Sequence, residues 1–219
     1  MSIITVERKV LEKNDEIAAV LKKQFSDQRT VVLNLVSSPG SGKTTLLEQT
    51  LQALQGQVRM AVVEGDVQTD NDAKRIARYH VPVAQIVTHG ACHLDAQLVR
   101  DAVSRIDLTG VQLLFIENVG NLVCPASYDL GEQHKIVMVS TTEGDDKPVK
   151  YPHMFRAADL CILNKTDLLP YVDFDKHQFR KNAEKINANL LFFEVSAKTG
   201  EGLQDWCQWL VDGTQTSGN

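Results

Sequence analysis

Residues 37–45 read Ser-Ser-Pro-Gly-Ser-Gly-Lys-Thr-Thr and lie between an apolar segment and a helical pattern. Glycines in such a turn let successive backbone N–H groups point at phosphate oxygens, and the N-terminus of the following helix adds positive partial charge. Lys43 can reach the terminal phosphates of a nucleotide, and the Thr44 hydroxyl can bind Mg²⁺. This pattern is typical of the phosphate-binding loop (P-loop) of a nucleoside triphosphatase, although Ser37 stands where the usual pattern begins with glycine. The residues expected to contact the phosphates are Gly40, Ser41, Gly42, Lys43, Thr44 and Thr45.

A second polar motif, Asn-Lys-Thr-Asp at 164–167, follows another apolar segment and can select the base. An ionised carboxylate only accepts hydrogen bonds, so Asp167 can take both N–H groups of the guanine edge, the ring N1–H and the exocyclic amine. Adenine presents an acceptor and no amine there, which would leave a buried carboxylate unpaired at a cost of about 1–3 kcal/mol or more. The motif therefore favours GTP over ATP. The residues expected at the base are Asn164, Lys165 and Asp167, with backbone N–H groups near Ser196 and Ala197.

Two carboxylates follow apolar segments at the edge of the sheet where α/β proteins bind ligands. Asp66 ends one segment, and Glu117 opens a Glu-Asn-Val-Gly motif in which Asp is the usual first residue. Either carboxylate can bind Mg²⁺ directly or through water, or orient the attacking water, and we favour Asp66 near both. Lys43, Asp66 and Glu117 are the candidate catalytic residues, and Gly120 is expected to sense the terminal phosphate. Because Asn121 rather than Gln follows this motif, we expect slow intrinsic conversion of GTP to GDP and phosphate.

Two cysteines and a histidine can form a transition-metal site. Cys92 and His93 are adjacent, and Cys124 follows shortly after the Glu-Asn-Val-Gly motif. Two thiolates and an imidazole suit Ni²⁺ or Zn²⁺, and the open position can be filled by water or by a second copy of the chain. By spacing alone, free cysteines and a surface histidine are the commoner alternative, but the position next to a phosphate-sensing motif favours a metal. Cys161 and Cys207 lie in apolar patterns and are interpreted as packing residues.

The composition is that of an ordinary globular protein, with 219 residues, 43% hydrophobic and 23% charged. The net charge of -5 provides no basic field for nucleic acid or an acidic membrane. No apolar run approaches the length of a membrane span, and residues 1–9 lack the apolar core of a signal peptide. We therefore expect a cytoplasmic protein with reduced cysteines that binds neither nucleic acid nor membrane.

Strand patterns alternate with helical patterns, which predicts a mainly parallel sheet with helices on both faces. The strand-like segments span 31–36, 57–64, 83–87, 111–116, 135–140, 158–163 and 190–195. Because the polar motifs follow the carboxyl ends of such segments, they are expected to meet at one edge of the sheet. The sequence therefore predicts an α/β fold of the P-loop NTPase class.

Apolar residues at helical spacing over about 3–25 predict an amphipathic N-terminal helix, with Asn14 as a break or cap between two pieces. We expect this helical extension (1–27) to pack on a single P-loop GTPase domain (28–212). A polar, flexible tail (213–219) is expected to follow the last helix.

Together these motifs resemble the hydrogenase nickel-incorporation GTPase family (HypB), over about residues 32–209. The resemblance is carried by residues 37–45, 64–67, 92–95, 117–125, 142–148 and 164–167. It implies a GTP-dependent homodimer whose interface holds Ni²⁺ or Zn²⁺ on Cys92, His93 and Cys124. It also implies a small nickel metallochaperone that docks near the N-terminal helix, and through it the hydrogenase large subunit. The sequence shows neither the Cys-rich N-terminal motif nor the His-rich run that some members carry, so we expect nickel at this site only.

We therefore interpret the chain as a GTP-hydrolysing metallochaperone whose nucleotide sets dimerisation and metal affinity. Lys147, in a polar loop, is either an exposed lysine or a residue that reaches the nucleotide, including that of a second subunit. A competing interpretation is the related GTPase of urease nickel insertion, but Cys92 and His93 are adjacent here where that family has Cys-Pro-His. Two more distant interpretations are a non-hydrolysing metal-binding scaffold with GTP as a structural ligand, and a signalling GTPase that binds no metal.

Overall fold

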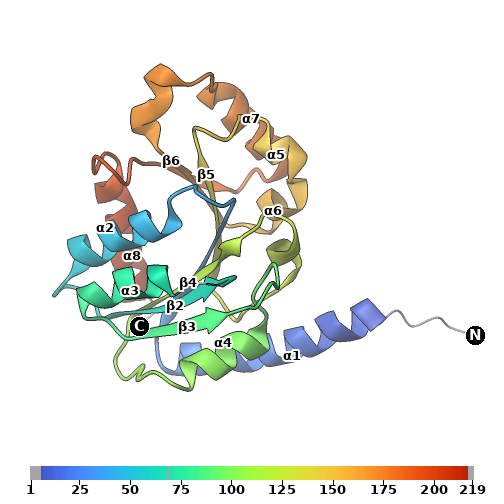
Figure 1. The fold of residues 1–219 in the computed structure, drawn as a ribbon, viewed down its shortest axis with the longest axis vertical. Helices are drawn as coiled ribbons and strands as arrows, with labels where there is room; N and C mark the ends of the chain where they lie inside the picture. Colours follow the sequence, from blue (N-terminus) through green and yellow to red (C-terminus); the bar gives the residue numbers. More distant parts are fainter. Residues whose placement is uncertain (1–5, 69, 217–219) are drawn as a thin grey trace, which may run out of the picture.

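The computed structural model describes residues 6–68 and 70–216 of the chain. Its centre is a seven-stranded sheet in the order β3-β2-β4-β1-β5-β6-β7, in which neighbouring strands are parallel (Figure 1). Strand β1 is buried along its whole length, as in a parallel sheet covered by helices on both faces. This arrangement confirms the predicted α/β fold. The strands are β1 (Val31–Ser37), β2 (Met60–Asp66), β3 (Val83–Val87), β4 (Leu113–Gly120), β5 (His134–Ser140), β6 (Leu160–Asn164) and β7 (Leu191–Glu194).

Helices cover both faces of this sheet. Helices α2, α3 and α8 pack on one face, whereas α1 and α4, followed toward β6 by α6 and α7, pack on the other. None of the helices within residues 6–68 and 70–216 is long and apolar enough to cross a membrane. The α-helices are α1 (Val6–Asp27), α2 (Lys43–Leu54), α3 (Asn71–Ile76), α4 (Ala96–Val103), α5 (Lys147–Lys150), α6 (Pro152–Ala157), α7 (Lys176–Ile186) and α8 (Leu203–Thr216). The short 3-10 helices are η1 (Ala77–Tyr79), η2 (Cys124–Ser127) and η3 (Thr166–Tyr171).

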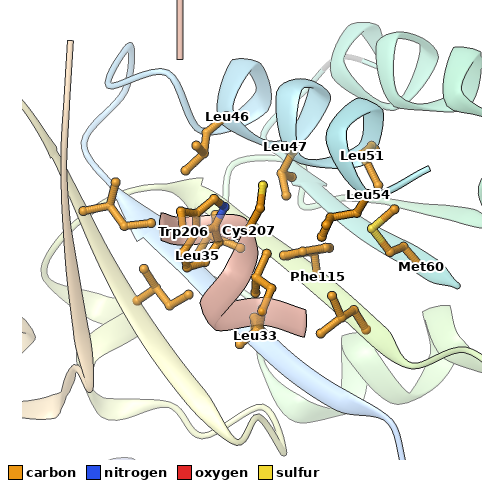
Figure 2. Close-up of a cluster of buried hydrophobic side chains, with 14 of the residues drawn as sticks. Leu33, Leu35, Leu46, Leu47, Leu51, Leu54, Met60, Phe115, Trp206 and Cys207 are labelled. Atoms are coloured by element: carbon orange, nitrogen blue, oxygen red, sulfur yellow. The ribbon is translucent and has the colours of Figure 1, made fainter. Parts of the chain in front are cut away.

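The core between α2 and α8 fixes the helix that follows the phosphate loop. Trp206 of α8 is fully buried, and its Nε1–H donates a 3.0 Å hydrogen bond to Thr50 Oγ1 of α2. Burying a side chain of this size stabilises the fold by roughly 1.5–3 kcal/mol or more. Figure 2 shows this cluster, which includes Leu33, Leu35, Leu46, Leu47, Leu51, Leu54, Met60, Phe115, Trp206 and Cys207. The predicted packing role of Cys207 and Cys161 is confirmed, because both side chains are buried.

The prediction that Asn14 breaks the N-terminal helix is wrong, because α1 is continuous from Val6 to Asp27. Asn14 is buried; its Nδ2–H donates to the backbone oxygen of Asp129 at 2.8 Å, and its Oδ1 accepts from the backbone N–H of Ala96 at 2.8 Å. An asparagine whose side chain is satisfied by backbone groups far away in the sequence no longer competes with its own helix for hydrogen bonds. Residues 3–5 of the predicted helix lie outside the described residues.

Several predicted boundaries also differ. Strand β4 continues through Glu117 to Gly120, and a register shift between Leu35 and Ser37 of β1 accommodates this extension. The Glu-Asn-Val-Gly motif is therefore part of a buried strand rather than a loop. Helix α8 extends to Thr216 and so includes the first residues of the expected tail, while residues 217–219 are outside the described part of the chain.

Candidate functional site

The phosphate loop connects β1 to α2 with the geometry that an anion requires. Gly40 and Gly42 have φ values of 75° and 99°, in the left-handed region that favours glycine. Gly42 is the N-cap of α2 and has no side chain to cap it, so the first N–H groups of the helix can bind an anion. The Lys43 ammonium donates a 2.8 Å hydrogen bond to Ser37 Oγ. The serine that replaces the usual first glycine thus supplies an acceptor that holds this lysine across the loop.

Buried carboxylates lie directly behind this loop. Thr44 Oγ1 donates a 2.9 Å hydrogen bond to Glu117 Oε1, and Glu64 faces Glu117 in the register of β2 and β4. Carboxylate oxygens of Glu64, Asp72 and Glu117 all lie within 4.8 Å of one another, and we refer to these residues as the carboxylate cluster. Within the described residues, the Oε2 atoms of Glu64 and Glu117 are buried without a hydrogen-bond partner. Orphaned carboxylate oxygens beside a threonine hydroxyl are a donor set that suits Mg²⁺.

The electrostatics of the cluster favour a cation or shared protons. Burial is the largest cause of the raised pKa of Glu64, and the negative charge of Glu117 raises this pKa further. Burial also raises the pKa of Glu117, although Lys43 opposes this effect. The sequence analysis favoured Asp66 as the carboxylate near Mg²⁺ and the attacking water, and it did not identify Glu64 or Asp72. Glu64 could have been noticed as an acidic residue in an otherwise apolar strand pattern. Only the pairing of β2 with β4 shows that it lies beside Glu117.

A cavity of about 570 Å³ brings the phosphate loop, the carboxylate cluster and the end of β4 together. Asp66 and Gly120 also line it, so the predicted catalytic and phosphate-sensing residues meet at one edge of the sheet. A Cβ at Gly120 would approach Pro39 of the phosphate loop to 2.9 Å, which explains why the contact requires glycine. Arg75, which sequence reasoning did not identify, lines the same cavity and forms ion pairs with Glu48 and Asp72.

The Asn-Lys-Thr-Asp motif is tied both to the phosphate loop and to the loop after β7. Asn164 Nδ2–H donates to the Ser41 backbone oxygen at 2.8 Å, and Asn164 Oδ1 accepts from the Ala197 N–H at 3.0 Å. The Ser196 hydroxyl donates to Asp167 Oδ1 at 2.7 Å. Lys165 Nζ reaches the Gly40 backbone oxygen at 2.7 Å. The predicted base-binding residues therefore form one connected group beside the phosphate loop.

Lys147 contacts the phosphate loop of its own chain. Its Nζ donates to Ser38 Oγ at 3.0 Å and forms an ion pair with Glu143, also at 3.0 Å. The side chain is only 14% exposed, so the interpretation of Lys147 as a solvated loop lysine is wrong.

The two cysteines and the histidine come together, forming a group that we call the thiol–imidazole cluster. Cys92 Sγ lies 3.1 Å from Cys124 Sγ and 3.6 Å from His93 Nδ1, and the candidate ligand atoms all lie within 4.8 Å of one another. Metal–ligand bonds of about 2.0–2.3 Å in a tetrahedron separate neighbouring ligand atoms by roughly 3.3–3.8 Å. The cluster therefore needs only small adjustments to hold Ni²⁺ or Zn²⁺.

The protonation of this cluster also suits a metal. Burial lowers the pKa of His93, so the imidazole is neutral and able to bind a metal near pH 7. A hydrogen bond to Cys124 raises the pKa of Cys92, which means that metal binding must displace a proton from the pair. The His93 ring packs on Tyr128 at a centroid distance of 4.0 Å, and this contact orients the imidazole. Cys92 is exposed, so the cluster is open to water or to another protein chain.

Comparisons with known proteins show which family the chain resembles. Residues 31–194 match the family described as CobW/HypB/UreG, nucleotide-binding domain. The hydrogenase maturation factor HypB of Escherichia coli K12 is 52% identical over 208 residues, which cover 95% of this chain and 72% of that protein. The crystal structure of HypB from Helicobacter pylori in complex with nickel has a TM-score of 0.88 and 40% identity, covering 93% of this chain and 96% of that one. The HypB structure from Archaeoglobus fulgidus has a TM-score of 0.87 and 36% identity, with coverages of 93% and 99%.

Proposed function

The chain belongs to the HypB hydrogenase maturation factors of the CobW/HypB/UreG family, and on this premise we propose that it hydrolyses GTP to control the delivery of nickel during [NiFe]-hydrogenase maturation. The observation that carries the proposal is one continuous segment, 117–124, which begins in the nucleotide cavity with Glu117 and ends in the thiol–imidazole cluster with Cys124. A change at one end of such a segment can be passed to the other end through the strand and the contacts that hold it.

For the nucleotide, we assign the phosphates to the loop from Gly40 to Thr45, with Lys43 released from Ser37 to meet the terminal phosphates. Thr44 and Glu117 would hold Mg²⁺, supported by Glu64, and the ion would neutralise phosphate charge when bound. Asp66 would orient the attacking water, while Gly120 would sense the terminal phosphate. At the base, Asp167 would accept from guanine, with Asn164, Lys165, Ser196 and Ala197 completing the pocket.

For the metal, we assign nickel or zinc to Cys92, His93 and Cys124. The three ligands leave a coordination position that the same residues of a second copy could complete, which would make the metal site part of a homodimer interface. The Helicobacter pylori relative, whose structure was determined in complex with nickel, supports nickel as the cargo. We place this cycle in the cytosol, where thiols stay reduced.

For the partner, we propose that a small nickel metallochaperone docks near α1 and passes nickel toward the hydrogenase large subunit. Helix α1 exposes Val10 and Val20, at 49% and 60% of their surface. Apolar side chains on a helix that is otherwise packed on its domain are suited to bind another protein.

Phosphate release from GTP tests the catalytic part. The wild-type protein should release phosphate slowly in the presence of Mg²⁺, and Lys43→Ala should reduce that rate at least tenfold. Lys185→Ala, which changes an exposed lysine of α7 that is assigned to neither the phosphates nor the base, is the matched control. Tight GTP binding without any turnover in the wild type would favour the scaffold in which GTP is a structural ligand.

Equilibrium titration with Ni²⁺ and Zn²⁺ tests the metal part. Cys92→Ala and Cys124→Ala should each weaken metal binding at least tenfold, whereas Cys207→Ala, which removes a packing thiol, should not. The mass in solution should increase from monomer to dimer on addition of a non-hydrolysable GTP analogue together with Ni²⁺. Identical metal affinities for all these variants would favour a signalling GTPase that binds no metal.

A further inference from the structure

Asn118 lies between Glu117 and the loop that carries two of the metal-ligand candidates. It is buried, and its Oδ1 accepts hydrogen bonds from the backbone N–H groups of Leu94, at 3.2 Å, and Val119, at 3.0 Å. Leu94 directly follows His93, so this bond holds the Cys92 and His93 loop against β4. Asn118 therefore joins a strand that ends in the nucleotide cavity to one half of the thiol–imidazole cluster.

The other half of the cluster is reached through buried polar residues on β1, on β5 and in the segment just before β5. Asn118 Nδ2–H donates to Asn34 Oδ1 at 3.2 Å, and Asn34 Nδ2–H donates to Glu132 Oε1 at 3.1 Å. Glu132 pairs with Lys135 at 3.5 Å. Lys135 Nζ then donates to the backbone oxygens of Pro125, at 3.1 Å, and Tyr128, at 2.8 Å.

These last two contacts hold the segment around Cys124. Pro125 directly follows Cys124 in η2, and the ring of Tyr128 packs on His93. Both halves of the thiol–imidazole cluster are thus connected to Asn118. The Cys92 and His93 loop is connected directly, and the segment around Cys124 is connected through Asn34, Glu132 and Lys135.

We propose that Asn118, Asn34 and Glu132 form a positioning relay that sets how strongly the bound nucleotide changes the metal affinity of the thiol–imidazole cluster. The proposal rests on the proposed function and assigns the residues through which its nucleotide control acts. Asn118 lines the nucleotide cavity, but its side-chain amide bonds to Leu94, Val119 and Asn34. None of the three relay side chains is assigned to touch the nucleotide or the metal.

The relay has a fixed direction of hydrogen bonding. Asn118 Oδ1 is held by two backbone donors, so its Nδ2 must donate to Asn34. The second Oε of Glu132 accepts from the Leu130 N–H at 2.6 Å, and a carboxylate at the end of the relay can only accept. Reversing the Asn34 amide alone would place like groups opposite each other at both ends. The relay therefore has one arrangement, and a substitution of equal size can break it or restore it.

Two single variants and the corresponding double variant test this order of donors and acceptors. Asn118→Asp replaces the donor facing Asn34 by an acceptor, and Glu132→Gln replaces the acceptor facing Asn34 by a donor. In Asn118→Asp/Glu132→Gln, a reversed Asn34 amide satisfies the side chains at 118 and 132 again, but the Oε1 position at 132 no longer offers an acceptor to Lys135. The double variant should therefore regain part of what each single variant loses. Asn187→Asp is the matched control, because Asn187 Nδ2 donates to the backbone oxygens of Phe155 and Ala158 in another part of the fold.

The measurement is the Ni²⁺ dissociation constant, obtained by competition with a chromophoric chelator, with GDP and with a non-hydrolysable GTP analogue. The ratio of the two constants is the coupling factor. Nickel must change the ratio of the GTP-analogue and GDP affinities by the same factor. Each single variant should reduce this factor at least fivefold toward one, while its Ni²⁺ affinity with GDP stays within threefold of wild type. Asn187→Asp should retain the wild-type factor, and the factor of the double variant should exceed that of both single variants. Melting temperatures and GDP affinities identify any variant that does not fold.

The outcomes separate this inference from the function on which it rests. A wild-type coupling factor of one overturns the proposed nucleotide control, and with it the relay. A wild-type factor above one that persists in folded Asn118→Asp and Glu132→Gln overturns the relay alone. If one single variant does not fold, the other single variant and the double variant give the same decision.

Discussion

Thr44 Oγ1 donates a 2.9 Å hydrogen bond to Glu117 Oε1, which joins the first turn of α2 to the strand that leads to Cys124. Thr44 is also the residue whose hydroxyl is expected to bind Mg²⁺ with GTP. Binding of the ion would therefore compete with, or add to, a bond that already holds β4. The nucleotide can thus act on this strand through a single carboxylate.

We expect Glu117→Gln to weaken the effect of Mg²⁺ on GTP binding. The amide oxygen can still accept from Thr44, but the negative charge that favours a divalent cation is lost. The Mg²⁺-dependent gain in GTP affinity should fall roughly tenfold, which corresponds to about 1.4 kcal/mol. Titration with a fluorescent GTP analogue, with and without Mg²⁺, measures this gain. Glu194→Gln, at an exposed ion pair with Lys176, should leave it unchanged.

We expect the unfolding free energy of the nucleotide- and metal-free protein to fall as the pH rises. Burial raises the pKa of Glu64, with the charge of Glu117 as a further cause, so the folded state keeps a proton that the unfolded chain releases above its ordinary pKa. The stabilisation is therefore fully present below about pH 4.3 and is lost as the pH approaches the raised folded-state pKa, with a slope of up to about 1.4 kcal/mol per pH unit.

Urea unfolding between pH 5 and 9 in the presence of a chelator measures this dependence. Glu64→Gln removes the titrating group and should flatten the profile. A profile parallel to that of the wild type would contradict a protonated Glu64 in the folded protein.

We expect Asp167→Asn to change base selection. Its carboxylate is replaced by an amide that can donate to a carbonyl at the 2-position of xanthine, while it loses an acceptor for the guanine amine. The preference for GTP over xanthosine triphosphate should fall about 100-fold or more. Competition between the two nucleotides measures this preference, and Asp173→Asn, an exposed acidic residue, is the control. Equal losses of affinity for both nucleotides would indicate a structural role for Asp167.

We expect Gly42→Ala to be more destabilising than Gly40→Ala. Both glycines have positive φ, but a Cβ at Gly42 would lie 2.6 Å from Asn164 Nδ2, whereas a Cβ at Gly40 meets nothing within 4 Å. The difference in unfolding free energy should be about 1–3 kcal/mol, because Asn164 would have to move and release Ser41 or Ala197. Urea unfolding and GDP binding measure both effects, and equal costs would show that Asn164 can move freely.

The sequence alone was sufficient for the motifs whose chemistry is local. The phosphate loop of residues 37–45 and the Asn-Lys-Thr-Asp motif depend on residues that are neighbours along the chain, since a turn and a helix N-terminus form within a few residues. The alternation of strand and helix patterns predicted the parallel sheet for the same reason. The pairing of Cys92 and His93 with Cys124 was a hypothesis from residue types and from the position of the phosphate-sensing motif.

The tertiary structure decided which distant residues face each other. Strand order and register place Glu64 opposite Glu117, and long-range hydrogen bonds keep Asn14 inside a continuous helix. Neither result can be derived from local preferences, because a strand pattern does not specify its neighbours and an asparagine side chain does not specify its partner. Short segments of sequence therefore determined the phosphate-binding and base-binding chemistry. The residues that surround these motifs and change their electrostatics were determined only by the packing of the whole chain, which buries polar groups from distant segments together.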